Sequence, residues 1–246
     1  MRVFAKLTRA EFRLFVREPM QLFWIFAFPA VLVVILGSIP AFRKPNDYLD
    51  GQRVIDLYVA IAIIMTLASL GLQVAPMVLA TYRERGILRR LATTPARPVA
   101  LLGAQLVMSL LTAVGSLVLV LIIGRVIFDV ALPRQPVGFV LAFLATAGAA
   151  FAIGLFVAAV APSGKAANTI GTLLFFPLMF FAGLWTPREV FPEVLRRIAD
   201  LTPLGAGERA VQEAMSGQWP AWGSLTVLVA YMLVFGLAAA RLFRWE

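Results

Sequence analysis

Few side chains in this sequence could carry covalent chemistry. Cysteine and histidine are both absent from the 246 residues, which excludes thiol nucleophiles, imidazole bases and the two commonest zinc ligands together. An enzyme acting on lipid would need convergent carboxylates near the membrane boundary. Only residues 187–220 offer them, without a recognisable catalytic spacing. The sequence therefore predicts no catalytic site, no metal and no enzyme activity for this chain.

Two glycine-containing fragments match parts of nucleotide-binding loops, and both fail on inspection. Gly164 and Lys165 fit the end of a phosphate-binding loop, but Ala159 stands where the loop needs glycine. Ala166 stands where it needs Ser or Thr. The run 205–207 (Gly-Ala-Gly) follows no predicted strand. The chain therefore has no nucleotide site of its own.

The elements that must position any functional side chains are membrane spans. Hydrophobic residues make up 61% of the chain, charged residues 14%, and the mean hydropathy is +0.89, too apolar for a soluble domain. A helix needs about 20 apolar residues to cross roughly 30 Å of hydrocarbon. Six stretches meet this length, and they predict an all-α membrane protein with one transmembrane domain over 1–246. The predicted spans are 22–40, 57–80, 99–124, 137–161, 167–186 and 221–240.

The charges between the spans predict the orientation. With a cytoplasmic amino terminus, the inner segments hold 13 Lys or Arg and 4 acidic residues, whereas the outer segments hold 9 of each. Cytoplasmic loops carry an excess of Lys and Arg. We therefore expect a multi-pass protein of the cell membrane with both termini in the cytoplasm. The net charge of +9 is attributed to loops that face anionic lipid, and not to nucleic-acid binding.

The spans lack titratable groups at depth. No Asp, Glu, Lys or Arg lies in the middle of any predicted span. Such a charge costs roughly 3 kcal/mol to insert, and proton-coupled transporters retain it for function, so its absence argues against a proton-driven antiporter. The uncharged polar residues in the spans usually serve helix packing. They are Thr66, Ser69, Gln73, Gln105, Ser109, Thr112, Ser116, Thr146, Asn168, Thr169 and Thr172.

The segment before the first span has helical periodicity. On a helical wheel its cations fall within an arc of about 80°, opposite an apolar side. The pattern predicts an amphipathic helix over 1–20 that lies in the membrane interface. A basic tail without periodicity is the alternative. The cations are Arg2, Lys6, Arg9, Arg13 and Arg17.

The segment 81–98 carries the second cluster of cations. It contains a small apolar group at helical spacing, flanked by arginines, as a docking surface for a partner would. A solvated positive loop is the plain alternative. The run Tyr82, Arg83, Glu84, Arg85, Gly86 through Leu91 to Pro95 resembles the cytosolic coupling segment of ABC-2 type transporter permeases, the membrane subunits of bacterial drug, lipid and polysaccharide exporters.

A second match to the same family lies about ninety residues later. It comprises the runs 181–187 (FAGLWTP), 191–192, 201–204 (LTPL) and 214–217, and is similar to the carboxy-terminal signature of that family. The region 187–220 is too charged to span the membrane and too apolar for a free loop. It predicts an external re-entrant hairpin between the fifth and sixth spans; interfacial helices without a role in the path are the alternative.

The resemblance implies a permease subunit of an ATP-binding cassette exporter. It implies two ABC ATPase subunits that bind ATP and Mg²⁺, a second permease copy or close homologue, membrane lipids as surroundings, and no cofactor in this chain. Residues 82–86, Leu91 and Pro95 would contact the ATPase, and a second group would shape the outer gate. A stand-alone carrier or channel and a membrane-embedded enzyme acting on lipid are the alternatives. The predicted gate residues are Phe181, Gly183, Pro187, Pro192 and Pro203.

Overall fold

The computed structural model describes residues 17–46, 49, 51–87 and 98–242. Across these ranges the regular structure is helical, with one isolated bridge between Pro45 and Arg53. The helices are α2 (Pro19–Leu22), η1 (Phe23–Ala27), α3 (Phe28–Ser38), η2 (Pro40–Arg43), α4 (Val54–Ala68), η4 (Ser69–Val74), α5 (Ala75–Glu84), α7 (Pro98–Phe128), α8 (Pro136–Val160), α9 (Gly164–Phe181), η5 (Arg188–Val190), α10 (Glu193–Leu201), α11 (Pro203–Ser216) and α12 (Trp222–Leu242).

Five of the described helices are long and apolar enough to cross a membrane. They are Pro19–Ser38, Val54–Glu84, Leu101–Phe128, Pro136–Val160 and Trp222–Leu242. The chain is thus a multi-pass helical membrane protein. The predicted span 167–186 corresponds to α9, an 18-residue helix whose first half carries Lys165 and Asn168. These polar residues explain why α9 is not among the five, and the count of six stays a prediction.

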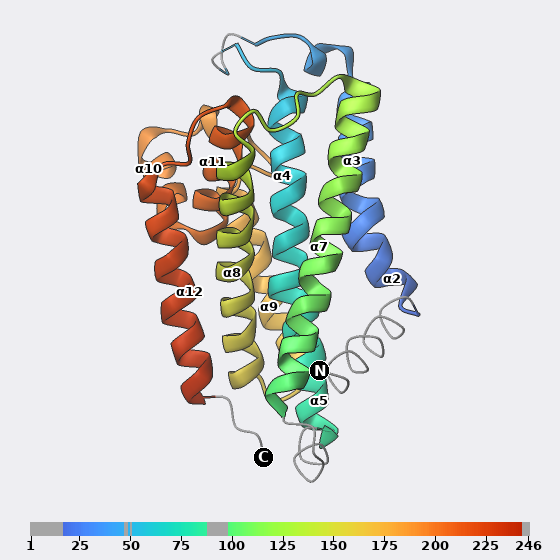
Figure 1. Cartoon of the computed structure of the whole chain (residues 1–246), viewed down its shortest axis with the longest axis vertical. Coiled ribbons are helices and arrows are strands. Elements are labelled where there is room, and N and C mark those ends of the chain that lie inside the picture. The colour runs from blue at the N-terminus through green and yellow to red at the C-terminus, as the bar shows by residue number, and fades with distance from the viewer. Residues whose placement is uncertain (1–16, 47–48, 50, 88–97, 243–246) are drawn as a thin grey trace.

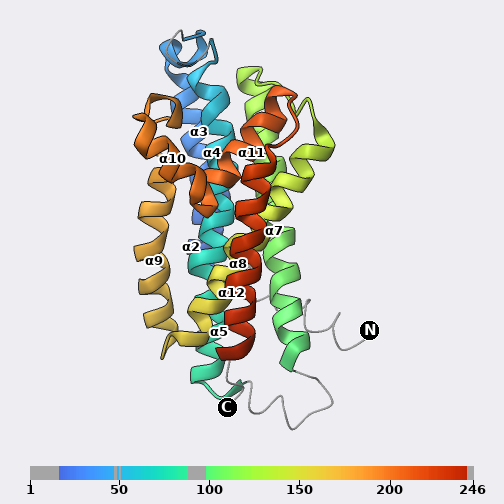
Figure 2. The same ribbon diagram turned by 90° about the vertical axis from the view of Figure 1, so that its left-hand side faces the viewer.

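The long helices run up and down in one bundle (Figures 1 and 2). One end, which we name the Arg83 end, holds residues 83–87, the α8–α9 turn at 160–164 and the end of α12. The other end, named the hairpin end, holds η2, the turn at 128–136 and the segment 182–221 with η5, α10 and α11.

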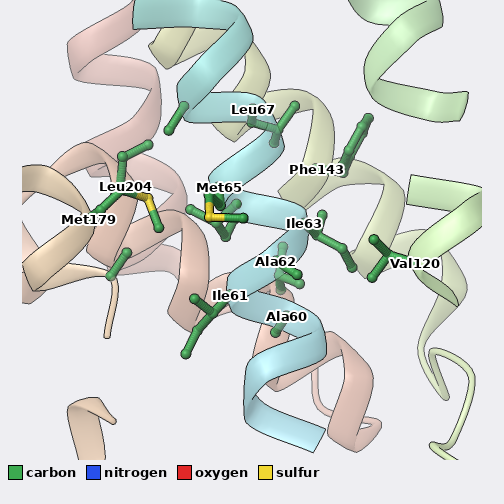
Figure 3. Close-up of a cluster of buried hydrophobic side chains, with 14 of the residues drawn as sticks. Ala60, Ile61, Ala62, Ile63, Met65, Leu67, Val120, Phe143, Met179 and Leu204 are labelled. Atoms are coloured by element: carbon green, nitrogen blue, oxygen red, sulfur yellow. The ribbon is translucent and has the colours of Figure 1, made fainter. Parts of the chain in front are cut away.

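Span Val54–Glu84 forms the centre of the bundle. Within the apolar 18-residue stretch of this span, 83% is buried inside the bundle. The corresponding share for α12 is 17%. Figure 3 shows side chains of α4 meeting Val120 of α7, Phe143 of α8, Met179 of α9 and Leu204 of α11. The peripheral helices leave large apolar side chains exposed, as expected where lipid and not water surrounds them.

Two of the spans contain a π-helical segment, η1 in the first and η4 in the second. A proline follows each segment: Pro29 follows η1, and Pro76 follows η4. Proline has no N–H to donate to the carbonyl four residues earlier. The helical hydrogen bonds that the carbonyls of Ile25 and Leu72 would accept from residues 29 and 76 are therefore missing. The hydroxyl of Ser116 on α7 donates to Ile25 O at 2.7 Å. Such segments are frequent at functional sites.

Glycines let the helices approach η4 closely. A Cβ on Gly154 of α8 would overlap Gly71 O, and one on Gly171 of α9 would overlap Leu72 O. Small residues at helix interfaces are the usual means of packing within a membrane. Both α8 and α9 therefore pack directly on the backbone of the central span.

The hairpin segment 187–220 folds into η5, α10 and α11 at the hairpin end (Figure 1). Most of α11 is buried, and it packs against α4, α8, α9 and α12. Helix α10 leaves Val194 and Leu201 exposed. The hairpin is thus partly an inner layer of the bundle, and its depth in a bilayer stays a prediction.

Candidate functional site

The residues at the end of α5 join three helices at the Arg83 end. The Arg83 guanidinium donates to the carbonyl oxygens of Ala158 (3.0 Å), Ala159 (2.8 Å) and Ala161, at the carboxyl end of α8. One oxygen of the next side chain, Glu84, accepts the backbone N–H of Gly164 at 3.0 Å, at the first turn of α9. The positive Arg83 therefore faces the partially negative carboxyl end of α8, and the negative Glu84 faces the partially positive amino end of α9.

The predicted coupling residues beside this pair differ in exposure, and Glu84 of the pair is itself exposed. Arg85 is exposed and Tyr82 is half-buried. Gly86 has φ +65° with no atom near its missing side chain, so its conformation, and not close packing, favours glycine. Leu91 and Pro95 lie outside the described residues. The predicted contact of this segment with an ATPase stays a prediction.

Tyr82 and Arg85 also line a cavity of about 350 Å³ at this end. Its wall on α7 includes Gln105, which is 7% exposed and whose Oε1 has no hydrogen-bond partner among the described residues. Two polar residues of α7 that sequence analysis assigned to helix packing therefore have different surroundings. Ser116 serves packing through its bond to Ile25 O, and Gln105 faces the cavity.

A larger groove of about 620 Å³ opens where the two π-helical segments meet. Its lining is mostly apolar and aromatic, and the polar positions are Gln21, Ser69, Gln73, Asn168 and Thr172. A concave apolar site with few polar groups is the usual form of a small-molecule site. The lining residues come from the first span (Met20, Gln21, Trp24, Ile25, Phe28), the second (Met65, Ser69, Gln73, Val74, Met77) and α9 with the turn after it (Asn168, Thr172, Phe175, Phe176, Leu184, Trp185).

The predicted gate residues lie at the starts and ends of the hairpin elements. Gly183 has φ +88° and ends α9: its N–H donates to Phe180 O at 2.9 Å, and that of Leu184 donates to Met179 O at 3.1 Å, a Schellman motif. Phe181 is the last residue of α9. The three prolines begin the short helices: Pro187 precedes η5, Pro192 precedes α10 and Pro203 opens α11. These positions explain how the hairpin is shaped, while a gating role stays a prediction.

A buried ion network holds the hairpin together. Arg188 of η5, 7% exposed, forms a close ion pair with Asp200 of α10, and its Nη1 lies 3.9 Å from Glu208 Oε2 on α11. Asp200 also meets Arg209 at 3.3 Å. Glu213 accepts from Arg209 at 2.9 Å and from the N–H of Ala221, just before α12, at 2.6 Å. The network thus ties η5, α10, α11 and the start of α12 together.

Glu208 is the most perturbed group in the hairpin. Its side chain is 2% exposed, and burial raises its pKa to about 8, with a further rise from Glu189 and an opposing effect of Arg188. Sequence analysis assigns Glu208 no role, because a single glutamate in a charged loop carries no signal of burial. One available signal is that Glu208 directly follows three small residues, Gly205, Ala206 and Gly207.

Part of the predicted interfacial segment lies outside the described residues. Arg2, Lys6, Arg9 and Arg13 belong to that part. Arg17 is described and exposed, directly before α2. The interfacial helix therefore stays a prediction.

Comparison with known proteins defines the class. The family model of the ABC-2 type transporter matches residues 2–216, which is most of the chain. This chain belongs to the ABC-2 type transporter family, whose members in general work with an ABC ATPase. It is also similar to a protein of Bacillus subtilis (strain 168) with the name "Putative transport permease YvfS", with 23% identity over 239 residues that cover 96% of this chain and 95% of the relative. The resemblance seen in segments 82–95 and 181–217 is thereby confirmed.

Proposed function

We propose that this chain is the permease subunit of an ATP-binding cassette exporter. A separate ATPase, which binds ATP and Mg²⁺, drives it, and a second permease copy or close homologue completes the membrane part. The cargo is a hydrophobic drug, a lipid or a glycan that leaves the cytoplasm. Both termini, the interfacial helix 1–20 and the segment 81–98 lie on the cytoplasmic side, α9 serves as the fifth of six spans, and 187–220 forms the external hairpin.

One observation carries this proposal. The most buried span, Val54–Glu84, continues directly into residues 85–87, which begin with the exposed Arg85. A force applied to that segment acts on the helix that contacts α7, α8, α9 and α11. Packed cores shift between discrete arrangements and do not deform continuously. The position of the segment therefore suits the transfer of movement from a partner at the Arg83 end to the hairpin end.

The groove between the first span and α9 suits the cargo path. It opens on the flank of the bundle, and Trp24, Phe176 and Trp185 on its rim are half exposed. A second copy facing this flank would enclose a path with aromatic walls. Phe181, Gly183, Pro187, Pro192 and Pro203 would then shape its outer gate.

Co-purification tests the proposal. The tagged chain is expressed with its genomic neighbours and isolated in mild detergent, with a tagged unrelated membrane protein as the control. We expect an ATP-hydrolysing subunit to be recovered with this chain and not with the control protein. Recovery of the chain without any such subunit would overturn the proposal.

One observation favours the alternative of a stand-alone carrier, namely the buried carboxylate Glu208, because proton-coupled carriers use such groups. Glu208 lies on α11, outside the five candidate spans. Vesicles that contain only this chain decide between the two. Uptake of a fluorescent hydrophobic dye driven by a pH gradient, and abolished in Glu208→Gln, would establish the carrier.

A further inference from the structure

Arg83 and Glu84 are adjacent in sequence, yet their charges serve two different helices. The last carbonyls of a helix and its first N–H groups have no partner within the helix. Arg83 supplies three donors to the end of α8, and Glu84 supplies an acceptor to the start of α9. Both helix ends belong to one turn, formed around residues 161–163. The pair therefore holds the α8–α9 turn from both sides.

The same three helices are in close contact above this pair. A Cβ on Gly164 would overlap the hydroxyl of Thr81 on α5, and the hydroxyl itself donates to Met77 O at 2.7 Å. Higher up, Gly154 approaches Gly71 O and Gly171 approaches Leu72 O. At Gly154 and Gly171 no side chain lies between α8 or α9 and the backbone of η4. The second span, α8 and α9 therefore have little freedom to slide past one another. The Arg83–Glu84 pair is the polar lower end of a close-packed unit.

The neighbouring Arg85 faces a different part of the bundle from this pair. Its side chain is exposed, as that of Glu84 is, and it lines the cavity between α5 and α7. Among the described residues it forms no ion pair with α8 or α9. Arg85 is therefore available to a partner, and it serves as the matched control for Arg83.

We propose that Arg83 and Glu84 are positioning residues that lock the α8–α9 turn to the coupling segment, so that movement of this segment carries α8 and α9 with it. This inference rests on the proposed function. It adds a mechanical role within the permease for both residues, separate from any contact with the ATPase. The lock is electrostatic at the helix ends and steric along the glycine contacts.

The experiment separates partner binding from transmission. The chain has no cysteine, so Ile87→Cys and Lys165→Cys can carry a pair of spin labels, and Val194→Cys can carry a single fluorophore at the hairpin end. The variants Arg83→Ala, Glu84→Ala and the control Arg85→Ala are prepared in each background. Glu84→Gln is the conservative variant, because its amide oxygen still accepts the Gly164 N–H.

We expect the 87–165 distance distribution to be narrow in the parent chain and at least twofold broader in Arg83→Ala and Glu84→Ala. Glu84→Gln should stay close to the parent. Both alanine variants should capture the ATPase within about twofold of the parent. Their ATP-induced emission change at residue 194 should fall at least fivefold.

Two results would overturn the inference: an unchanged 87–165 distribution in Arg83→Ala and Glu84→Ala, or a loss of ATPase capture in these two variants well beyond about twofold. If even the parent chain captures no ATPase, the proposed function fails. The spin-label distance then still tests the lock, because it is measured on the chain alone.

Discussion

The central span Val54–Glu84 is held at both ends by an arginine, and the two ends differ in what that arginine binds. At the hairpin end, Arg53 donates to Phe128 O at 3.3 Å and Asp129 O at 3.1 Å, at the end of α7, and pairs with Asp56 of its own helix at 2.6 Å. At the Arg83 end, Arg83 holds the end of α8.

The difference lies in the accompanying carboxylate. Asp56 neutralises the charge of Arg53 at the start of the same helix, so this carboxylate binds no further helix. Glu84 instead reaches another helix, so the Arg83 end joins three helices and continues into an exposed segment. The comparison indicates one end built to hold the span in place and one end built to pass movement on. The predictions below test this contrast, beginning with the charges that are most buried.

The largest effect is expected from removal of the buried cation in the hairpin. Arg188→Ala removes the close ion-pair partner of Asp200, which then keeps Arg209 alone, and breaking a pair that contains a buried charge costs about 3–5 kcal/mol. The free energy of unfolding in detergent micelles should fall by this amount. Arg197→Ala is the control, since its side chain is 77% exposed, and it should change stability by less than about 0.5 kcal/mol. Equal effects of the two variants would show that the hairpin network is not structural.

The second prediction concerns pH. The pKa of Glu208 is raised to about 8 from 4.5, so between these values the folded chain holds a proton that the unfolded chain has lost. Stability therefore falls as pH rises through this window, by roughly 2 kcal/mol between pH 6 and 8. The midpoint of thermal unfolding should fall accordingly. In Glu208→Gln this dependence should flatten, and an equally steep dependence there would contradict the assignment.

The third prediction concerns the packing of α9 on the central span. Gly171→Ala places a Cβ against Leu72 O and should cost roughly 1–3 kcal/mol through overpacking. Gly236→Ala on α12 is the matched control, because no atom lies within 4 Å of its missing Cβ; it should be neutral or slightly stabilising. Thermal unfolding of both variants in the same detergent gives the comparison. A neutral Gly171→Ala would mean that α9 is not held against η4.

The smallest effect is expected at Arg53. Arg53→Ala removes donors from two helix-terminal carbonyls on a partly exposed surface, a loss of about 1 kcal/mol. It should leave ATP-dependent changes at residue 194 intact, whereas Arg83→Ala should suppress them. A loss of transmission in Arg53→Ala of the size expected for Arg83→Ala would remove the contrast between the two ends.

The sequence could predict the spans because apolar length is a local property. Five predicted spans coincide with helices that are long and apolar enough to cross a membrane. The remaining predicted span, 167–186, corresponds to α9, whose Lys165 and Asn168 lower its apolar character, and it stays a prediction. The family was also predictable, since the motifs at 82–95 and 181–217 keep their order and spacing.

The contacts of the site could not be predicted. The double role of Arg83 and Glu84 requires the α8–α9 turn to lie beside α5, which no short motif encodes. The π-helical segments were equally hidden, because proline signals a disturbed ladder but not the form it takes. The burial of Glu208 depends on how α11 packs between other helices.

The proposed function requires that this chain has no energy source of its own. The direct test is accumulation of a fluorescent hydrophobic dye by sealed vesicles that contain the chain with or without its captured ATPase, in the presence and absence of ATP. The account predicts uphill accumulation only with the ATPase and ATP together. Uphill accumulation by vesicles that contain the chain alone would contradict it.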